Sequence, residues 1–303
     1  MLVTKKAPDF TAKAVLADGQ IVDSFNLYEN IGEKGAVLFF WPLDFTFVCP
    51  SEIIAFSNRM DEFTSRGINV IGCSIDSQFT HFAWRETPVE NGGIGRIKKI
   101  IKGKKMLVTK KAPDFTAKAV LADGQIVDNF NLYENIGEKG AVLFFYPLDF
   151  TFVCPSEIIA FSKRIDEFTS RGISVIGCSV DSQFSHFAWR ETPVENGGIG
   201  RIKYPLVADL SKSISRDYDV LFGESVALRG SFLIDADGTV RHAVINDLPL
   251  GRNIDEMIRM VDAMLFTNEH GEVCPAGWAK GDEGMKADTK GVAEYLAKNE
   301  GKL

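Results

Sequence analysis

The chain has 303 residues and a formal net charge of −7, so it lacks the basic surface that broad nucleic-acid binding needs. Hydrophobic residues make up 45% and charged residues 25%, which is typical of a globular protein with a core. No apolar run reaches the roughly 18 residues of a membrane span, and MLVTKKAPDF lacks the apolar core of a secretory signal. We therefore expect a cytoplasmic protein with no membrane partner, in which any disulfide is transient and catalytic.

Residues 1–98 recur as residues 106–203 without a gap, and 91 of the 98 aligned positions are identical. A solenoid would repeat a shorter unit, usually three or more times. Here only the second copy continues, through residues 204–303. We expect a truncated half-domain at 1–98, a linker at 99–105 and a complete domain at 106–303. The seven differing pairs are Ser24/Asn129, Trp41/Tyr146, Asn58/Lys163, Met60/Ile165, Asn69/Ser174, Ile75/Val180 and Thr80/Ser185.

The segment KIIKGKK at 99–105 is basic and has no hydrophobic period, as expected of a linker. A second interpretation stays open. Lys-Gly-Lys-Lys-Met can be encoded by a purine-rich ribosome-binding sequence ahead of a start codon. Met106 would then be the original start, joined to a truncated first copy by duplication or by an assembly error.

In the second copy, the continuous apolar run at 141–145 predicts a strand buried on both faces. A loop follows, and residues 156–172 have helical spacing that ends at Gly172. Residues 173–181 predict a second buried strand, and 186–193 a short helix closed by proline.

Further along, residues 227–245 contain two β-rich runs around the turn Asp237-Gly238. Residues 255–265 form an amphipathic pattern, and 291–299 a short terminal helix. Strands that alternate with helices predict an α/β sheet with helices on both faces.

The first copy has only the first strand, the cysteine helix and the second strand of this series. It cannot bury the sheet that it begins, so we expect it to be partly folded or disordered. Both copies compete for residues 204–303, which occur once. For the first copy to fold with residues 204–303, the roughly 105 intervening residues must loop out, at a loop-closure free-energy cost of about 4 kcal/mol. We expect the second copy to fold with this half.

Cys154 lies between a predicted strand and a predicted helix, and Pro155 suits the first helical turn. Free N–H groups at a helix N-terminus stabilise a thiolate, which is the nucleophilic form of cysteine. Thr151 can place its hydroxyl in the same pocket. By itself, a cysteine at a helix start is more often structural than catalytic. The absence of a CxxC pair argues against a dithiol reductase, and no Cys/His spacing fits zinc.

The pattern Pro147-x-x-x-Thr151-x-x-Cys154 closely resembles the active-site motif of peroxiredoxins. Residues 106–303 as a whole resemble a typical two-cysteine peroxiredoxin of the alkyl hydroperoxide reductase C type. The resemblance implies a thioredoxin-like α/β fold, preceded here by the incomplete copy. It also implies a thiol-dependent peroxidase for hydrogen peroxide and organic hydroperoxides, without cofactor or metal. Other similar segments are GGIG (197–200), ALRGSFLID (227–235), NDLPLGRN (246–253) and HGEVCPAGW (270–278).

The resemblance makes Cys154 the peroxidatic cysteine, which attacks the peroxide and becomes a sulfenic acid. Cys274, from the partner subunit of a homodimer, would resolve it as an intersubunit disulfide. Thioredoxin or a flavoprotein would then act as electron donor, and dimers would assemble further into a decameric ring. The helix after Cys154 must unwind for the sulfurs to meet. Family members with GGLG and Tyr-Phe motifs resist unwinding and over-oxidise; here GGIG and Tyr295-Leu296 leave that sensitivity open.

The same resemblance assigns supporting roles around the sulfur. Thr151 and Arg229 would hydrogen-bond the peroxide and stabilise the thiolate, Pro147 would shield the sulfur from water, and Glu157 would brace Arg229. Arg252 fits either this network or an interface. The first-copy equivalents are expected to be idle, because the first copy has no arginine strand and no resolving cysteine of its own: Cys49, Thr46 and Pro42.

Other candidate residues have structural interpretations. Cys178 lies in an apolar strand and is expected to behave as a small hydrophobe. His186 and Trp189 are expected to pack, and His242 to be a strand residue rather than a ligand. The alternative function is a holdase chaperone or a peroxide-signalling protein. A chaperone role would survive replacement of Cys154 by serine, whereas peroxide consumption would not.

Overall fold

The computed structural model describes residues 2–95 and 107–299. The expected linker at 99–105 and the start at Met106 lie outside these residues. The described residues form two compact units. One contains residues 2–6 and 107–264, and the other contains residues 7–95 and 265–299. This division differs from the expected one, because the end of the second copy from Leu265 onward belongs to the unit of the first copy.

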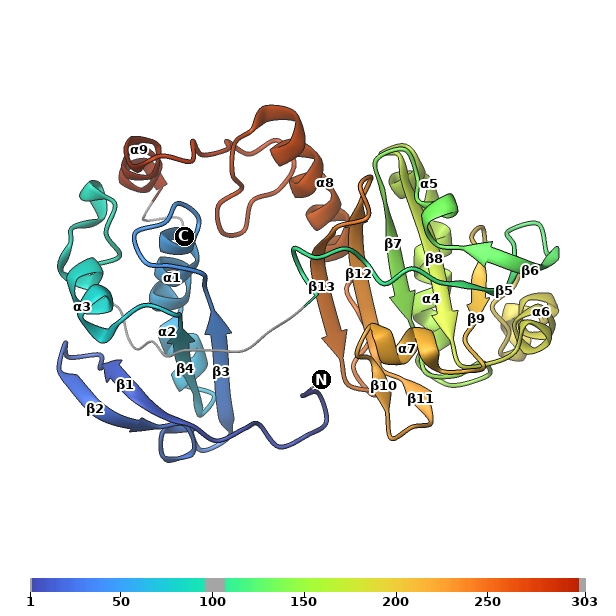
Figure 1. The fold of residues 1–303 in the computed structure, drawn as a ribbon, viewed down its shortest axis with the longest axis horizontal. Helices are drawn as coiled ribbons and strands as arrows, with labels where there is room; N and C mark the ends of the chain where they lie inside the picture. Colours follow the sequence, from blue (N-terminus) through green and yellow to red (C-terminus); the bar gives the residue numbers. More distant parts are fainter. Residues whose placement is uncertain (1, 96–106, 300–303) are drawn as a thin grey trace. The chain divides into compact units, whose positions relative to one another are not determined.

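The unit of the second copy is built on a seven-stranded sheet in the order β13-β12-β7-β8-β9-β5-β6 (Figure 1). The central strands β7, β8 and β9 are parallel, and all other neighbours are antiparallel. The sequence did not predict the β5–β6 hairpin or β9. The strands are β5 Thr116–Val120, β6 Ile126–Asn131, β7 Gly140–Phe145, β8 Ile173–Ser179, β9 Leu206–Ala208, β12 Arg229–Asp235 and β13 Val240–Asn246.

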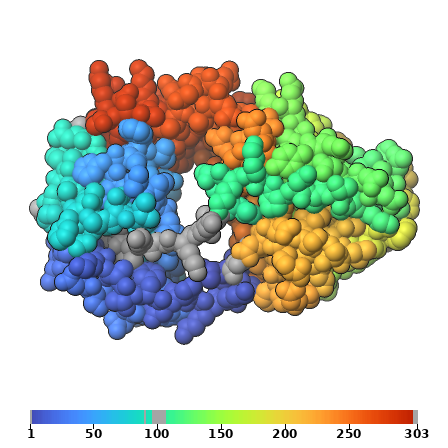
Figure 2. All heavy atoms as spheres, viewed as in Figure 1, coloured from blue at the N-terminus to red at the C-terminus, as the bar shows by residue number. Residues whose placement is uncertain are grey.

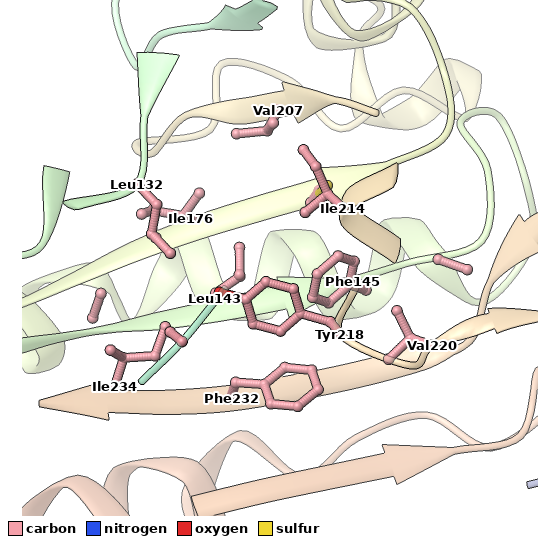
Figure 3. Close-up of a cluster of buried hydrophobic side chains, with 14 of the residues drawn as sticks. Leu132, Leu143, Phe145, Ile176, Val207, Ile214, Tyr218, Val220, Phe232 and Ile234 are labelled. Carbon is pink, nitrogen blue, oxygen red and sulfur yellow. The ribbon is translucent and has the colours of Figure 1, made fainter. Parts of the chain in front are cut away.

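Strand β7 is buried along its whole length, and its side chains alternate between two packed faces. Phe145 points into the cluster shown in Figure 3, where its ring centroid lies 5.2 Å from that of Tyr218. Phe144 faces the opposite side and stacks on Phe161 at 4.5 Å. The strand is therefore buried on both faces, as the continuous apolar run predicted, and helices lie on both sides of the sheet, as the alternation of strands and helices predicted.

The helix expected over 156–172 forms as two helices, because the backbone leaves the helical region at Arg164, where φ is −104°. Gly172 follows with φ of +71°, a conformation that favours glycine. Helix α6 begins earlier than expected, since the Ser182 hydroxyl accepts from the Ser185 N–H and caps it. The helices are α4 Cys154–Lys163, α5 Ile165–Thr169, α6 Gln183–Glu191, α7 Ser213–Asp217 and α8 Ile254–His270.

Three short 3-10 helices and a two-stranded antiparallel ribbon lie in the loops between these elements. They are η3 Tyr133–Asn135, η4 Val194–Asn196 and, in the first copy, η2 Val89–Asn91, with the ribbon β10 Leu221–Phe222 and β11 Val226–Ala227. The turn at Asp237-Gly238 joins β12 to β13, as expected.

In the other unit, the first copy forms the elements of its sequence twin but not the full sheet. Its strands make two separate two-stranded sheets, β1–β2 and β3–β4. Without an equivalent of β12, the Phe40 side chain at the end of β3 is 53% exposed, whereas Phe145 at the same position of β7 is fully buried. The elements are β1 Thr11–Val15, β2 Ile21–Asn26, η1 Tyr28–Asn30, β3 Gly35–Phe40, α1 Cys49–Asn58, α2 Met60–Thr64, β4 Ile68–Cys73 and α3 Gln78–Glu86.

The same unit contains the C-terminal segment, residues 265–299, which ends in α9 Thr289–Asn299. In Figure 2 the red C-terminal atoms lie against the blue and cyan atoms of the first copy. A shared apolar cluster joins them: Ile54, Met285, Val292 and Leu296, with Phe47, Val89, Val273 and Tyr295 packed around it. The segment thus supplies the first copy with part of the core that its own residues lack.

Candidate active site

Cys154 is the first residue of α4, directly after the loop that leaves β7. Its side chain is fully buried, and Pro155 occupies the first turn of the helix. Phe150 has a φ of +53°, a conformation that is unusual for a bulky residue and that turns the loop back toward the helix. The Thr151 Oγ1 lies 2.8 Å from the Cys154 Sγ and 2.8 Å from the Leu148 carbonyl oxygen.

Two hydrogen-bond patterns satisfy this arrangement. With a thiol, the S–H donates to Thr151, whose hydroxyl donates to the Leu148 carbonyl. With a thiolate, the Thr151 hydroxyl turns and donates to the sulfur. The pair can therefore follow the ionisation of the sulfur without moving a heavy atom.

Arg229 approaches the same sulfur from β12. Its guanidinium Nη1 lies 3.4 Å from the Cys154 Sγ and 2.5 Å from the Glu157 Oε2, while its Nε donates to the Leu248 carbonyl at 2.7 Å. Arg229 is only 3% exposed, so its charge acts on the sulfur with little screening by water. A buried guanidinium in contact with the sulfur can stabilise negative charge that develops there during a reaction.

Glu157, one turn along α4, lies between two arginines. Arg252 donates to its Oε1 from Nε at 2.8 Å and from the backbone N–H at 2.9 Å, and Arg229 holds Oε2. Burial raises the pKa of Glu157, but Arg252 and Arg229 outweigh burial and hold it below its usual range. Arg252 also donates to the carbonyls of Phe145 and Gly230. The sequence left its role open; the structure joins it to the network that orients Arg229.

A second buried network lies behind the loop. The Tyr146 hydroxyl donates to Asp149 Oδ1 at 2.9 Å, and the His186 Nδ1 lies 2.8 Å from Asp149 Oδ2. The His186 Nε2 contacts the Val207 carbonyl at 3.2 Å. Asp149 precedes Thr151 by two positions, so this network fixes the loop. His186 and Trp189 are both fully buried, in keeping with their expected packing role.

Pro147, also buried, begins the loop, and Cys178 lies fully buried in β8, where burial raises its pKa well above the usual value. His242 lies in β13 opposite Leu233, and burial lowers its pKa. The described residues hold no group of three side chains that could bind a metal ion. None of the helices among them is long and apolar enough to cross a membrane.

The equivalent site of the first copy is incomplete. Cys49 begins α1 and Thr46 precedes it, but Pro42 is exposed. Burial raises the pKa of Cys49, the Thr46 hydroxyl opposes this, and the Glu52 carboxylate adds to it. Within the described ranges no arginine donates to Cys49 or pairs with Glu52, because this copy has no counterpart of β12. The sequence predicted that the first copy lacks this arginine strand; that Cys49 is idle stays a prediction.

Cys274 belongs to the unit of the first copy and lies on the stretch that docks there. Its sulfur is 3.7 Å from the Thr267 Oγ1, and its side chain is partly buried. Two residues further on, the Ala276 N–H donates to the Ser51 hydroxyl at 3.0 Å. Ser51 is in the first turn of the Cys49 helix. The structure therefore brings the segment of Cys274 to α1, while the five other expected catalytic residues lie in the other unit.

The ranges matched by protein-family models correspond to the two copies and to the C-terminal segment. Residues 3–92 and 108–243 match the AhpC/TSA family, so the family is found twice in the chain. Residues 263–298 match the C-terminal domain of 1-Cys peroxiredoxin. The second match corresponds closely to the segment that the structure separates at Leu265.

Individual relatives give the same result. Alkyl hydroperoxide reductase C of Helicobacter pylori (strain ATCC 700392 / 26695) is 66% identical over 198 residues, 65% of this chain and 100% of the relative. Peroxiredoxin-1 of Gallus gallus is 52% identical over 195 residues, 64% and 97% of the two chains. The reduced 2-Cys peroxiredoxin of Plasmodium vivax superposes with a TM-score of 0.62 at 50% identity, covering 64% of this chain and 100% of that one. The chain belongs to the AhpC/TSA family and is a thioredoxin-like peroxiredoxin with a partial N-terminal duplication.

Proposed function

We propose that the second copy is the working thiol-dependent peroxidase of this chain and that Cys154 is its peroxidatic cysteine. The observation that supports this most directly is the contact of the Cys154 sulfur with Thr151 and Arg229. The Thr151 hydroxyl and the buried Arg229 guanidinium both donate to the sulfur, so both are in reach of a peroxide oxygen that approaches it.

The reaction balances as follows. The Cys154 thiolate attacks one peroxide oxygen, the O–O bond breaks, and the other oxygen leaves as water or an alcohol after taking up a proton. Arg229 and Thr151 donate to the oxygens as charge develops on them. The resulting sulfenic acid condenses with a second thiol to give a disulfide and water. An external dithiol supplies the two electrons and two protons that restore the thiols.

We assign the second thiol to Cys274 of another copy of the chain, which requires at least a homodimer. The family's named relatives support this assignment, since they include 2-Cys peroxiredoxins. Thioredoxin or a flavoprotein reductase is the proposed electron donor, and a decameric ring the proposed higher assembly. The relatives' names do not favour the alternative of a holdase chaperone or peroxide-signalling protein.

The test compares three full-length variants, each reduced and then exposed to hydrogen peroxide. Cys154→Ser is expected to abolish peroxide consumption, whereas the matched variant Cys49→Ser is expected to retain most of it. Cys274→Ser is expected to stop turnover after one equivalent. Peptide mapping of the oxidised wild-type chain should show a Cys154–Cys274 link. Peroxide consumption that depends on Cys49 and not on Cys154 would reject the proposal.

A further inference from the structure

Each copy carries the same apolar surface beside its cysteine helix, and the C-terminal segment packs on this surface, here called the docking face, in the first copy but not in the second. In the first copy, Phe47, Ile54 and Val89 pack with the C-terminal segment. Their sequence-identical counterparts in the second copy are left open: Phe152 is 100% exposed and Val194 is 53% exposed. The local sequence does not cause this difference, so the covering segment does.

Polar and close-packed positions follow the same pattern. Ser51 is fully buried and accepts from the Ala276 N–H, whereas Ser156 at the same position of α4 is exposed. A Cβ added at Gly92 would meet Thr289 at 3.7 Å, whereas one added at Gly197 would meet nothing within 4 Å. The covered face thus runs from the first turn of the cysteine helix to the GGIG loop.

We propose that the first copy is a built-in docking module that holds the chain's own C-terminal segment, in competition with the identical face of the second copy. One segment cannot cover both faces at once. While residues 273–296 occupy the first copy, the face around Phe152 stays open, and Cys274 stays beside the Cys49 helix. For the second copy, the matching occupant is the C-terminal segment of a second copy of this chain.

The consequence for catalysis rests on the proposed function; the docking does not. If Cys274 resolves the Cys154 sulfenic acid, each segment held by a first copy is withdrawn from that step. The sulfenic acid then lives longer and meets a second peroxide more often, which gives the sulfinic acid. The duplication would therefore slow disulfide formation without altering any residue of the Cys154 site.

The repeat provides matched variants to test the docking. Phe47→Asp breaks the contact on the first copy, and Phe152→Asp makes the same change on the second. Phe152 is fully exposed, so an aspartate at this position does not by itself disturb the surrounding fold. Val89→Asp and Val194→Asp form a second, independent pair. The measurement is amide hydrogen exchange of residues 273–296 in the reduced full-length chain.

Phe47→Asp and Val89→Asp are expected to speed exchange across residues 273–296 at least about tenfold, and Phe152→Asp and Val194→Asp to leave it within about twofold. Equal or greater deprotection by the second-copy variants would overturn the proposal, as would no change with any variant. Disulfide mapping after one equivalent of peroxide separates the two ideas. If exchange behaves as expected but Cys274 never links to Cys154, the resolving role fails and the docking stands.

Discussion

The Arg229 guanidinium lies 3.4 Å from the Cys154 sulfur, although the two residues are 75 positions apart in the chain. The contact exists because β12 pairs with β7, which leads directly into the cysteine loop. The first copy repeats β7 as β3, but no strand among residues 2–95 and 107–299 pairs with that edge of β3. One strand pairing therefore distinguishes a buried thiol with an arginine donor from a buried thiol without one among the described residues, in nearly the same sequence.

Replacing Arg229 with lysine should slow peroxide consumption at least about tenfold. Lysine keeps a positive charge near Glu157, but it lacks the planar fork that reaches Glu157, Leu248 and the sulfur together. A lost charge-assisted hydrogen bond of about 1.5 to 3 kcal/mol corresponds to a factor of about 10 to 160. Stopped-flow assays with hydrogen peroxide measure it. Arg241→Lys, on the neighbouring strand, is the control, and an Arg229→Lys rate within twofold of wild type would contradict the role.

Replacing Glu157 with glutamine should destabilise the second-copy unit by about 3 kcal/mol, because two buried guanidinium groups would lose the carboxylate that they share. Glu52→Gln makes the same change in the first copy, where the carboxylate has no arginine partner among the described residues, and should cost well under 1 kcal/mol. Urea unfolding at pH 7 provides the comparison. Equal losses of unfolding free energy in the two variants would show that the pairing of Glu157 with the arginines does not stabilise the fold.

The Glu157 effect should also depend on pH. The folded-state pKa of Glu157 is lowered relative to the unfolded value of about 4.3. Its carboxylate therefore stabilises the fold fully above that value, and this contribution is lost as the pH falls through the folded pKa. The stability gap between the wild type and Glu157→Gln should be constant from pH 6 to 8 and shrink below about pH 4. A gap that widens in acid would give the opposite sign and rule out the pairing as its source.

Cys49 should react with iodoacetamide much more slowly than Cys154 at pH 7.5. Burial raises the Cys49 pKa, so little thiolate is present at pH 7.5, and the rate should rise about tenfold for each pH unit as the pH is increased toward that pKa. Differential alkylation and mass spectrometry measure both sites in one sample. Their tryptic peptides differ in mass because Trp41 and Asn58 in one correspond to Tyr146 and Lys163 in the other. Faster alkylation of Cys49 would mean that the incomplete site is the activated one.

Most of the Cys154 site could be predicted from the sequence. The apolar run of β7 and the proline after Cys154 place the thiol at a helix start, and the motif resemblance pointed to Thr151 and Arg229. The role of Arg252 could not be assigned, because its contact with Glu157 depends on how the loop after β13 folds back. No sequence pattern around Arg252 predicts its contact with Glu157.

The position of the C-terminal segment could not be predicted for a different reason. The loop-closure argument treated residues 204–303 as one block that folds as a whole with one copy or the other. The structure divides this block at Leu265, and residues 206–264 and 265–299 fall in different units. The sequence cannot indicate which copy the C-terminal segment packs against, since both copies present the same residues to it. Only burial, as at Phe47 and Phe152, separates them.

Tyr146 and Trp41, one of the seven differences between the copies, lead to a final prediction. The Trp41 Nε1 donates to Asp44 Oδ1 at 2.9 Å, the same bond that the Tyr146 hydroxyl makes to Asp149. Burial raises the Tyr146 pKa well above its usual value, and Asp149 adds to this, so the hydroxyl keeps its proton and donates.

Tyr146→Trp should therefore cost less than about 1 kcal/mol, whereas Tyr146→Phe should cost about 1 to 3 kcal/mol by leaving the buried Asp149 short of a donor. The loop that carries Thr151 begins at this bond, so the phenylalanine variant should also consume peroxide more slowly, and the tryptophan variant should not. Urea midpoints and initial rates on the same preparations test both effects. If phenylalanine is tolerated as well as tryptophan, the Asp149 network does not position the cysteine loop.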